Sequence, residues 1–353
     1  MGVPEMTSQF SKIFALASSL GCLTTAAVAQ DPIRMKVSSF VPEVHMLTQL
    51  TKDYMVDLEA VSDGAIKLDY YGSQALGKAV EQFDLTIEGL ADIGVFCSVY
   101  TPSRFPLNGM LELPFFNPSA KVGTRLAWEI SRHEAVAKEF SEVKLLMPVI
   151  PSPSQIFANK KIEKVGDFKG MRMVGIGPLF AQAYELMGVQ SVTMGYPDTY
   201  LALERGTIDG GPLSWAASTG WKWQEVAQYP VDINLMGGFA CGIIMNKDSW
   251  SKLSPDLQTK WDEVAAKHSQ IIAATYDAND SKAKGVWEGM DKPVFDFPAG
   301  EKEKLANMLA PVWANWIETN EEKGLPAKDL YRLYVKTMHE MGEPVLIKLP
   351  DYQ

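Results

Sequence analysis

The side chains that could carry enzymatic chemistry are few and scattered along the sequence. The four histidines, His45, His133, His268 and His339, are distant from one another and from the cysteines. A protein zinc site needs three or four such ligands, usually at short spacings, so we expect no metal site. The motifs G-x-S-x-G, H-E-x-x-H and C-x-x-C do not occur in the chain. The sequence therefore indicates no catalytic residue, and we expect neither enzymatic activity nor a cofactor.

The charge of the chain argues against nucleic acid as a partner. The 33 Lys and Arg residues are outnumbered by 43 Asp and Glu residues, which gives a formal net charge of −10. A protein that binds the phosphate backbone needs a basic face instead. The length of 353 residues exceeds what a single hydrophobic core usually supports, and it favours two domains.

The first 29 residues are typical of an export signal. Residues 13–29 carry no charge and end in Ala-Val-Ala, a small-x-small pattern that signal peptidase accepts. The run is too short and too polar for a membrane span. We therefore expect residues 1–29 to be a signal peptide and the mature chain to be periplasmic. Translation from Met6 rather than Met1 would remove Glu5 and leave a net positive charge before the apolar run. Both start codons remain alternatives.

Two cysteines, Cys97 and Cys241, remain after such a cleavage. They allow one disulfide. Each lies among small and apolar residues, however, which is typical of buried free thiols. We favour the interpretation as two buried thiols, with a disulfide as the alternative.

Hydrophobic periodicity predicts alternating strands and helices in the first part of the mature chain. The predicted strands cover residues 33–40, 66–70 and 92–100, and the predicted helices cover residues 47–61 and 80–90. This β-α-β-α-β order implies a parallel sheet with helices on its faces. Ligands bind beyond the carboxyl ends of such strands. There the sequence places Phe40, Glu43 and Tyr100.

A cluster of Pro and Ser at residues 151–154 separates this part from a second α/β series. Such breaker residues predict a crossover between domains, and Ser154 ends it. The pattern on either side of the cluster predicts helices over 119–143, 178–187 and 197–205, and strands over 145–150, 155–159 and 171–175. Residues 243–246 form a strand that returns to the first domain.

The last third of the chain is predicted to be helical. The pattern over residues 255–290 is longer than a usual helix of 8–20 residues, so the helix is either kinked or spans both domains. Two further helices close the chain. Trp313 and Trp316, spaced at i, i+3, are interpreted as core residues.

Two segments resemble a known family of receptors. The sequences DFKGMRM at 167–173 and YLALERGTIDG at 200–210 are similar to those of the extracytoplasmic solute receptors of tripartite ATP-independent periplasmic (TRAP) transporters. Other segments match the family in the same order: GSQALG at 72–77, EGLADIG at 88–94, ELPFF at 112–116, MNKDSW at 245–250 and LSPDLQ at 253–258.

The resemblance implies an α/β fold of two lobes, like that of periplasmic binding proteins. Each lobe has a mixed sheet flanked by helices, and a long helix spans both lobes. We expect lobe 1 to comprise residues 30–152 and 241–275, and lobe 2 to comprise residues 153–240 and 276–353. Such a receptor closes on one small molecule and delivers it to the small and large membrane subunits of an ion-driven transporter, without catalysis.

The chain departs from the family where the ligand would be bound. Most members carry an Arg at the end of the strand after the Lys-Gly pair, which binds the ligand carboxylate bidentately. Val174 occupies that position here, and Arg172 lies two residues earlier on the same face of the strand. Either Arg172 reaches the site, or it is a surface cation and the site lacks the clamp. An acid that many members have after Asp209-Gly210 is also missing, so we expect no metal bridge to the ligand.

The candidate ligand-binding residues combine the strand ends with the family positions. They are Phe40, Glu43, Tyr100, Ser154, Arg172, Val174, Ile176, Tyr196, Leu213, Trp215 and Phe239. The family favours a small organic acid as the ligand. The aromatic residues and Glu43 would equally suit an amine, a polyol or another neutral or cationic ligand. An exported enzyme of similar fold, a signalling receptor, and a purely structural role for Trp215 are the remaining alternatives.

Overall fold

The computed structural model describes residues 31–292 and 294–352. The predicted signal peptide and both candidate start residues lie outside the described residues. Within the described part of the chain, no helix has both the length and the apolar character that a bilayer crossing requires. The same part brings together no group of three His, Cys, Asp or Glu side chains that could hold a metal ion.

The first sheet contains five strands in the order β2-β1-β3-β10-β4. Their bounds are β1 (Ile33–Ser39), β2 (Ile66–Tyr71), β3 (Ile93–Cys97), β4 (Val143–Val149) and β10 (Cys241–Asn246). β1 runs parallel to β2 and β3, and β10 is antiparallel to β3 and β4. The helices between the parallel strands are α1 (Met46–Val61) and α2 (Gln82–Ile87), preceded by η1 (Ala79–Glu81). The parallel start predicted from the alternation of strands and helices is confirmed.

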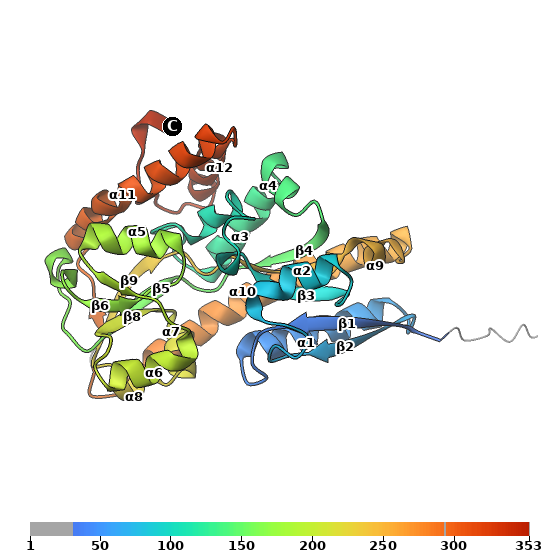
Figure 1. The fold of residues 1–353 in the computed structure, drawn as a ribbon, viewed down its shortest axis with the longest axis horizontal. Coiled ribbons are helices and arrows are strands. Elements are labelled where there is room, and N and C mark those ends of the chain that lie inside the picture. The colour runs from blue at the N-terminus through green and yellow to red at the C-terminus, as the bar shows by residue number, and fades with distance from the viewer. Residues whose placement is uncertain (1–30, 293, 353) are drawn as a thin grey trace, which may run out of the picture. The chain divides into compact units, whose positions relative to one another are not determined.

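The second sheet contains six strands in the order β11-β9-β5-β8-β6-β7. Their bounds are β5 (Ser154–Ala158), β6 (Arg172–Val174), β7 (Gln190–Val192), β8 (Gly210–Leu213), β9 (Tyr229–Met236) and β11 (Phe295–Asp296). β6 is parallel to β7 and β8, whereas β5 is antiparallel to β8 and β9. Both sheets are thus mixed and flanked by helices, as predicted (Figure 1).

Further helices cover the sheets and close the chain. They are η2 (Ser98–Tyr100), η3 (Asn108–Glu112), α3 (Ala120–Ser131), α4 (Glu134–Glu139), η4 (Val165–Phe168), α5 (Pro178–Met187), α6 (Tyr196–Glu204), α7 (Trp215–Gly220), α8 (Trp223–Val226), α9 (Lys247–Ser251), α11 (Ala299–Glu322), α12 (Ala327–Glu340) and η5 (Pro350–Tyr352). The prediction of one helix over 119–143 is wrong. α3 ends at Ser131 with Arg132 as its C-cap, and His133 begins α4 as the N-cap, where its Nδ1 accepts the Ala135 N–H at 3.3 Å.

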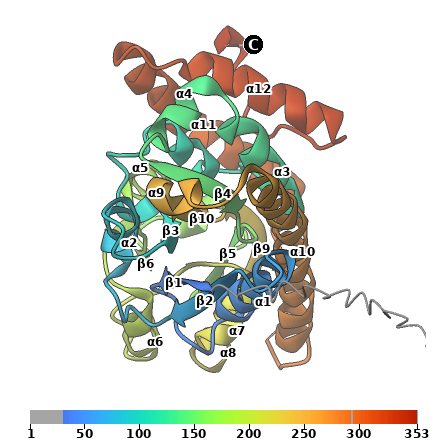
Figure 2. The ribbon, with the colours of Figure 1, turned by 90° about the vertical axis from the view of Figure 1, so that its right-hand side faces the viewer.

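The long helix α10 (Pro255–Glu288) is continuous and packs against helices of both sheets. Figure 2 shows it beside α1 and α7. Its first half is bound to helices of the first sheet: His268 lies 2.9 Å from Asp57 of α1, and Trp128 Nε1 of α3 donates to Ser269 Oγ at 2.8 Å. Near the helix end, Trp287 Nε1 donates to Ser218 Oγ of α7 at 2.9 Å. The predicted spanning of both lobes is confirmed.

Two carboxylates of α10, one turn apart, bind the N-termini of helices from different sheets. Asp277 accepts the N–H groups of Ala120 and Lys121 in α3 at 2.7 and 3.2 Å. Asp280 accepts the N–H of Ala216 in α7 at 2.8 Å. A carboxylate at a helix N-terminus satisfies backbone donors that have no partner within the helix. α10 thus changes from contacting α3 at Asp277 to contacting α7 at Asp280. This change begins within one turn of the lobe boundary that we proposed at 275/276.

The closing helices α11 and α12 pack into the largest hydrophobic core. Trp313 and Trp316 are buried there, as predicted. Their indole N–H groups donate to the carbonyl oxygens of Pro114 and Pro106 at 2.8 and 2.9 Å, respectively. These two hydrogen bonds join α11 to the segment that follows β3.

We predict that Asp277→Ala destabilises the fold by about 1–2 kcal/mol, because two N–H groups of α3 lose a charged acceptor. Urea unfolding would measure the change. The matched control is Asp262→Ala on the same helix, which removes an exposed ion pair to Lys144 and should change stability by less than about 0.5 kcal/mol. Equal effects of the two variants would contradict the assigned role of Asp277.

Candidate functional site

Five of the predicted site residues come together where segments of the two sheets meet. We call them the aromatic cluster; its members are the four aromatic residues Phe40, Tyr100, Tyr196 and Phe239 and the aliphatic residue Ile176. Phe40 follows β1, Tyr100 ends η2, Ile176 follows β6, Tyr196 begins α6, and Phe239 lies in the crossover from β9 to β10. All five side chains are half-buried. Four of them, all but Tyr196, pack on the core of the first sheet.

The rings of the cluster form two edge-to-face pairs. The centroids of Phe40 and Tyr100 are 5.5 Å apart, and those of Tyr196 and Phe239 are 6.2 Å apart. Tyr196 Oη donates to the carbonyl of Pro212 at 2.8 Å. Burial and the nearby Tyr100 raise the pKa of Tyr196 above its ordinary value, so its hydroxyl stays a donor. Such rings offer apolar faces and polar hydroxyls to a small molecule.

The N-terminus of α5 lies beside this cluster. Gly177, which precedes the helix, has a φ of +87°, and a Cβ placed on it would come within 3.2 Å of Val99 Cγ2 in η2. No described side chain caps α5. Pro178 has no N–H, so the free donors of the first turn are the N–H groups of Leu179 and Phe180, and these favour a negative charge. The first turn contains no acidic residue that would already supply one.

Val174, Leu213 and Trp215 lie in a different environment. They are buried in a third core cluster of the second sheet, where Val174 is 0% exposed. The Trp215 ring packs edge-to-face on Phe157, with centroids 5.1 Å apart. A Cβ on Gly211 would clash with Val174 Cγ1, so this strand pair is tightly packed. Tyr196 of the aromatic cluster packs against this third core.

Arg172 is bound to a carboxylate and lies apart from the cluster. Its Nε and one terminal nitrogen donate to Asp209 at 3.3 and 3.0 Å, and its backbone N–H donates to the same carboxylate at 2.8 Å. The terminal nitrogen also donates to the carbonyl of Gly206 at 2.7 Å. Two of the three guanidinium nitrogens thus donate to neighbouring groups.

The position of the Arg172–Asp209 pair follows from strand direction. β6 and β8 are parallel, with Met173 opposite Gly210, so Arg172 and Asp209 both lie at the amino ends. Ligands in such sheets bind at the carboxyl ends. Burial raises the pKa of Asp209, but Arg172 and Lys160 outweigh burial and hold this pKa well below its usual value. Asp209 is thus a permanent anion that fixes Arg172.

The two remaining candidates lie outside the cluster. Glu43 is exposed and pairs with Lys52 at 2.6 Å. Ser154 begins β5, where it is paired with Met236 of β9.

Trp215 also lines a polar cavity of about 350 Å³ beside α10. The charged side chains around this cavity are Asp232, Asp277, Asp280 and Lys284. Lys284 pairs with Asp232, and the other two acids bind helix N-termini. Three acids with one base make the cavity unsuited to an organic anion, so we place the candidate ligand site at the aromatic cluster.

The sequence profile of a family described as "Bacterial extracellular solute-binding protein, family 7" matches residues 37–320. The chain belongs to this family. The resemblance to TRAP solute receptors that the sequence motifs indicated is thereby confirmed, and the family is one of solute-binding receptors.

Curated proteins and solved structures resemble this receptor over nearly their whole length. The protein named outer membrane transporter protein TsaT, from Comamonas testosteroni, is 23% identical over 338 residues, covering 92% of this chain and 97% of TsaT. The fold matches a TRAP periplasmic solute-binding protein from Desulfovibrio salexigens with a TM-score of 0.81, at 20% identity, over 92% and 100% of the two chains. A TRAP solute-binding protein from Rhodoferax ferrireducens, solved with copurified benzoate, gives 0.79 at 24% identity over 88% and 98%.

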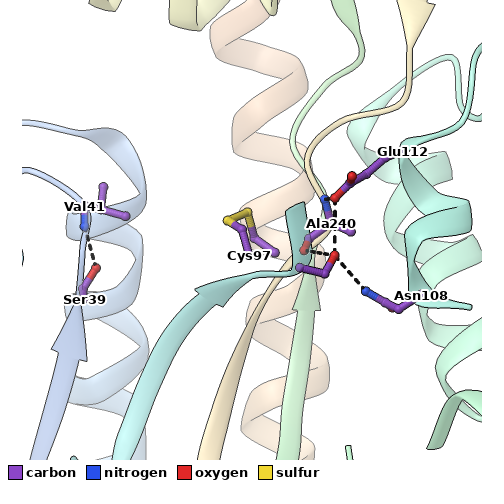
Figure 3. The surroundings of a disulfide bond; sticks show 8 residues. Ser39, Val41, Cys97, Asn108, Glu112 and Ala240 are labelled. Carbon is purple, nitrogen blue, oxygen red and sulfur yellow. Dashed lines mark hydrogen bonds between the residues drawn. A yellow bond between two sulfur atoms is a disulfide. The ribbon is translucent and has the colours of Figure 1, made fainter. Parts of the chain in front are cut away.

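A disulfide joins two strands that lead into segments of the cluster in this receptor. Cys97 ends β3 and Cys241 begins β10, and they are bonded (Figure 3). The interpretation as two buried thiols is wrong. The antiparallel register places Cys241 directly opposite Cys97, with their Cα atoms 3.8 Å apart. Local sequence could not reveal this, because the pairing depends on strands 144 residues apart.

A buried carboxyl that sequence reasoning missed lies next to this disulfide. Glu112 is 8% exposed, and its Oε1 accepts the Ala240 N–H at 3.2 Å and the Ser98 hydroxyl at 3.3 Å. Burial raises the pKa of Glu112 to about 7, against the opposing effect of these hydrogen bonds. The residue belongs to the ELPFF segment quoted for the family, but nothing in that pattern indicates a buried acid.

We predict that Glu112→Gln flattens the dependence of stability on pH. The folded state holds the Glu112 proton more tightly than the unfolded chain does. Its contribution to stability is therefore complete below about pH 4.5 and is lost as the pH rises through about 7. Between pH 5 and pH 8 the wild type should lose on the order of 2 kcal/mol more than the variant.

Urea unfolding at the two pH values would measure this difference. Glu139, whose pKa burial also raises to about 7, is present in both proteins and cancels in the comparison. Parallel pH profiles for the wild type and Glu112→Gln would contradict the prediction.

Proposed function

We propose that this chain is a periplasmic TRAP receptor for one small organic acid with an aromatic or apolar body. The receptor closes on the ligand between its two sheets and delivers it to the small and large membrane subunits of an ion-driven transporter. The observation that carries the proposal is the aromatic cluster, whose two ring pairs come from segments of both sheets.

The cluster fits a flat apolar body better than a sugar or a polyol. Its members offer two tyrosine hydroxyls, and Tyr196 Oη already donates to a backbone carbonyl. A polyol would need several further polar partners to replace its hydration, whereas an aromatic ring packs on Phe40, Tyr100 and Phe239. Benzoate, which the Rhodoferax ferrireducens protein was solved with, has such a body.

The negative charge of an acid would be met by backbone N–H groups rather than by a guanidinium. Val174 is buried and Arg172 is bound to Asp209, so neither residue supplies the clamp. The uncapped N-terminus of α5 beside Gly177 is a group next to the cluster that favours an anion. We therefore propose that the carboxylate binds there.

A second candidate is a ligand without a carboxylate. The missing clamp itself favours it, because a carboxylate that is buried without sufficient partners is costly. Aromatic faces also bind cations. A neutral or cationic aromatic compound would then occupy the same cluster.

Export to the periplasm agrees with the disulfide. Structural disulfides persist in oxidising compartments and are rare in the cytosol. We propose that residues 1–29 are removed on export. Mass spectrometry of protein purified from the periplasm should find Gln30 as the first residue, and a chain that retains residues before it would contradict this cleavage.

A matched set of ligands tests the proposed class. Benzoate, benzamide and benzylamine share one ring and differ in charge, so a thermal-shift measurement with the mature receptor separates the candidates. A ligand at 100 times its dissociation constant stabilises by about 2.7 kcal/mol, which raises the melting temperature by roughly a few degrees. We expect a shift with benzoate alone. A shift with benzamide or benzylamine but not benzoate would support the second candidate and overturn the first.

Variants of Arg172 and Phe239 locate the site. Arg172→Met should leave the thermal shift with benzoate unchanged, because the guanidinium lies at the opposite strand ends from the cluster. Phe239→Ala should abolish that shift, because it removes one ring of a pair. The reverse outcome, with the response lost in Arg172→Met and kept in Phe239→Ala, would restore Arg172 as the clamp.

A further inference from the structure

Two segments that carry rings of the aromatic cluster meet at the disulfide. Cys97 ends β3, and Tyr100 follows three residues later at the end of η2. Cys241 begins β10, and Phe239 precedes it by two residues in the crossover. The cystine therefore links covalently the two segments that each carry one ring of an aromatic pair.

Hydrogen bonds join the same two segments immediately beyond the disulfide. Ser98 donates to the carbonyl of Ala240 through both its backbone N–H and its hydroxyl, at 2.8 and 3.1 Å. Ala240 N–H in turn donates to Glu112, and Asn108 Nδ2 donates to Ser98 Oγ at 3.2 Å. Figure 3 shows this buried network continuing from the cystine toward η3.

The crossover has little room to relax on its other side. A Cβ on Gly237 would clash with the carbonyl of Leu111, and one on Gly238 would clash with the carbonyl of Pro151. Phe239 is therefore held between a tightly packed glycine pair and the Ala240 network.

The cystine occupies the last rung of the β3–β10 ladder. Cys97 opposite Cys241 is the final pair in the antiparallel register, and it is followed by the hydrogen bonds between Ser98 of η2 and Ala240 of the crossover. The end of a ladder opens more readily than its centre. A covalent bond at this rung prevents that opening where both segments carry cluster rings.

We propose that the Cys97–Cys241 disulfide is a positioning element of the ligand site. It sets the spacing of Tyr100 and Phe239, and thereby the size of the ring that the site admits. The part concerning the ligand rests on the function proposed above, whereas the part concerning the two segments stands independently of it.

The first test needs no ligand. Amide hydrogen exchange is compared between the wild type and the double variant Cys97→Ala/Cys241→Ala. We expect exchange to be about tenfold faster or more at residues 98–101 and 237–240, with the interior of β3 and β10 unchanged. Unchanged exchange in both segments would overturn the proposal. Acceleration across the whole first sheet would also overturn it, because it would show a general structural role.

Two further samples complete this test. Asp277→Ala should destabilise the protein without accelerating exchange in the two segments, which separates local positioning from loss of stability. Where the double variant does not fold, the wild type is reduced with dithiothreitol in urea below the unfolding transition. The reagent gives two electrons and two protons to the cystine, leaving two thiols, and becomes a cyclic disulfide. The reduced protein should show the same local acceleration, and reoxidation should reverse it.

The second test concerns ring size. Calorimetry with benzoate and 2-naphthoate gives the ratio of their dissociation constants in the oxidised wild type and in the double variant. We expect the wild type to favour benzoate and the variant to reduce this preference about fivefold or more. An unchanged ratio, with both compounds bound, would overturn the control of ring size. If neither compound binds either protein, the proposed ligand class fails, while the exchange test still decides the role of the disulfide.

Discussion

The arrangement of the two sheets depends on carboxylates that satisfy helix N-termini from a third helix. Asp277 and Asp280 lie one turn apart on α10 and bind α3 of the first sheet and α7 of the second. Unpaired N–H groups at a buried helix end lower the stability of the fold. Each carboxylate therefore stabilises the fold and fixes the position of one helix end relative to α10. The N-termini of α3 and α7 are more than 90 residues apart in the sequence, and both are bound to α10. We infer that this shared attachment helps to bring rings from both sheets together.

In the second sheet, an ion pair determines which charged groups remain available to bind a ligand. Asp209 binds the guanidinium of Arg172 and holds it at the amino ends of the strands. The carboxyl ends are left with apolar side chains, hydroxyls and backbone N–H groups. In the function that we propose, the receptor keeps the family's fold while its recognition chemistry differs from a guanidinium clamp.

Much of this fold could be predicted from the sequence, because its signals are local. Pro178 at the start of α5 and Gly188 after its end mark the helix directly, and the alternation over the first three strands indicates a parallel sheet. β8 and β9 were missed because glycine and proline interrupt their patterns. The break at His133 was missed because histidine is an unusual N-cap.

The site was predicted less completely than the fold, for a different reason. Strand alternation gives the face on which Arg172 lies, but its partner Asp209 comes from a distant segment. Phe40 and Tyr100 were proposed because they follow strand ends, and Tyr196 was proposed because it matches a family position. Glu112 and the disulfide depend on contacts across the crossover, which neither periodicity nor composition encodes.

The disulfide also makes a closed ring of the chain between Cys97 and Cys241, a separation of 144 residues that contains β4 to β9. A single cut by a protease anywhere inside this ring leaves the two pieces covalently joined. A receptor nicked in an exposed loop of the second sheet would therefore run as one species in a gel until a reductant is added. Hydrolysis of one peptide bond adds only one water to the mass of the joined pieces. Under oxidising conditions, a mass measurement that cannot resolve one water would therefore miss this damage.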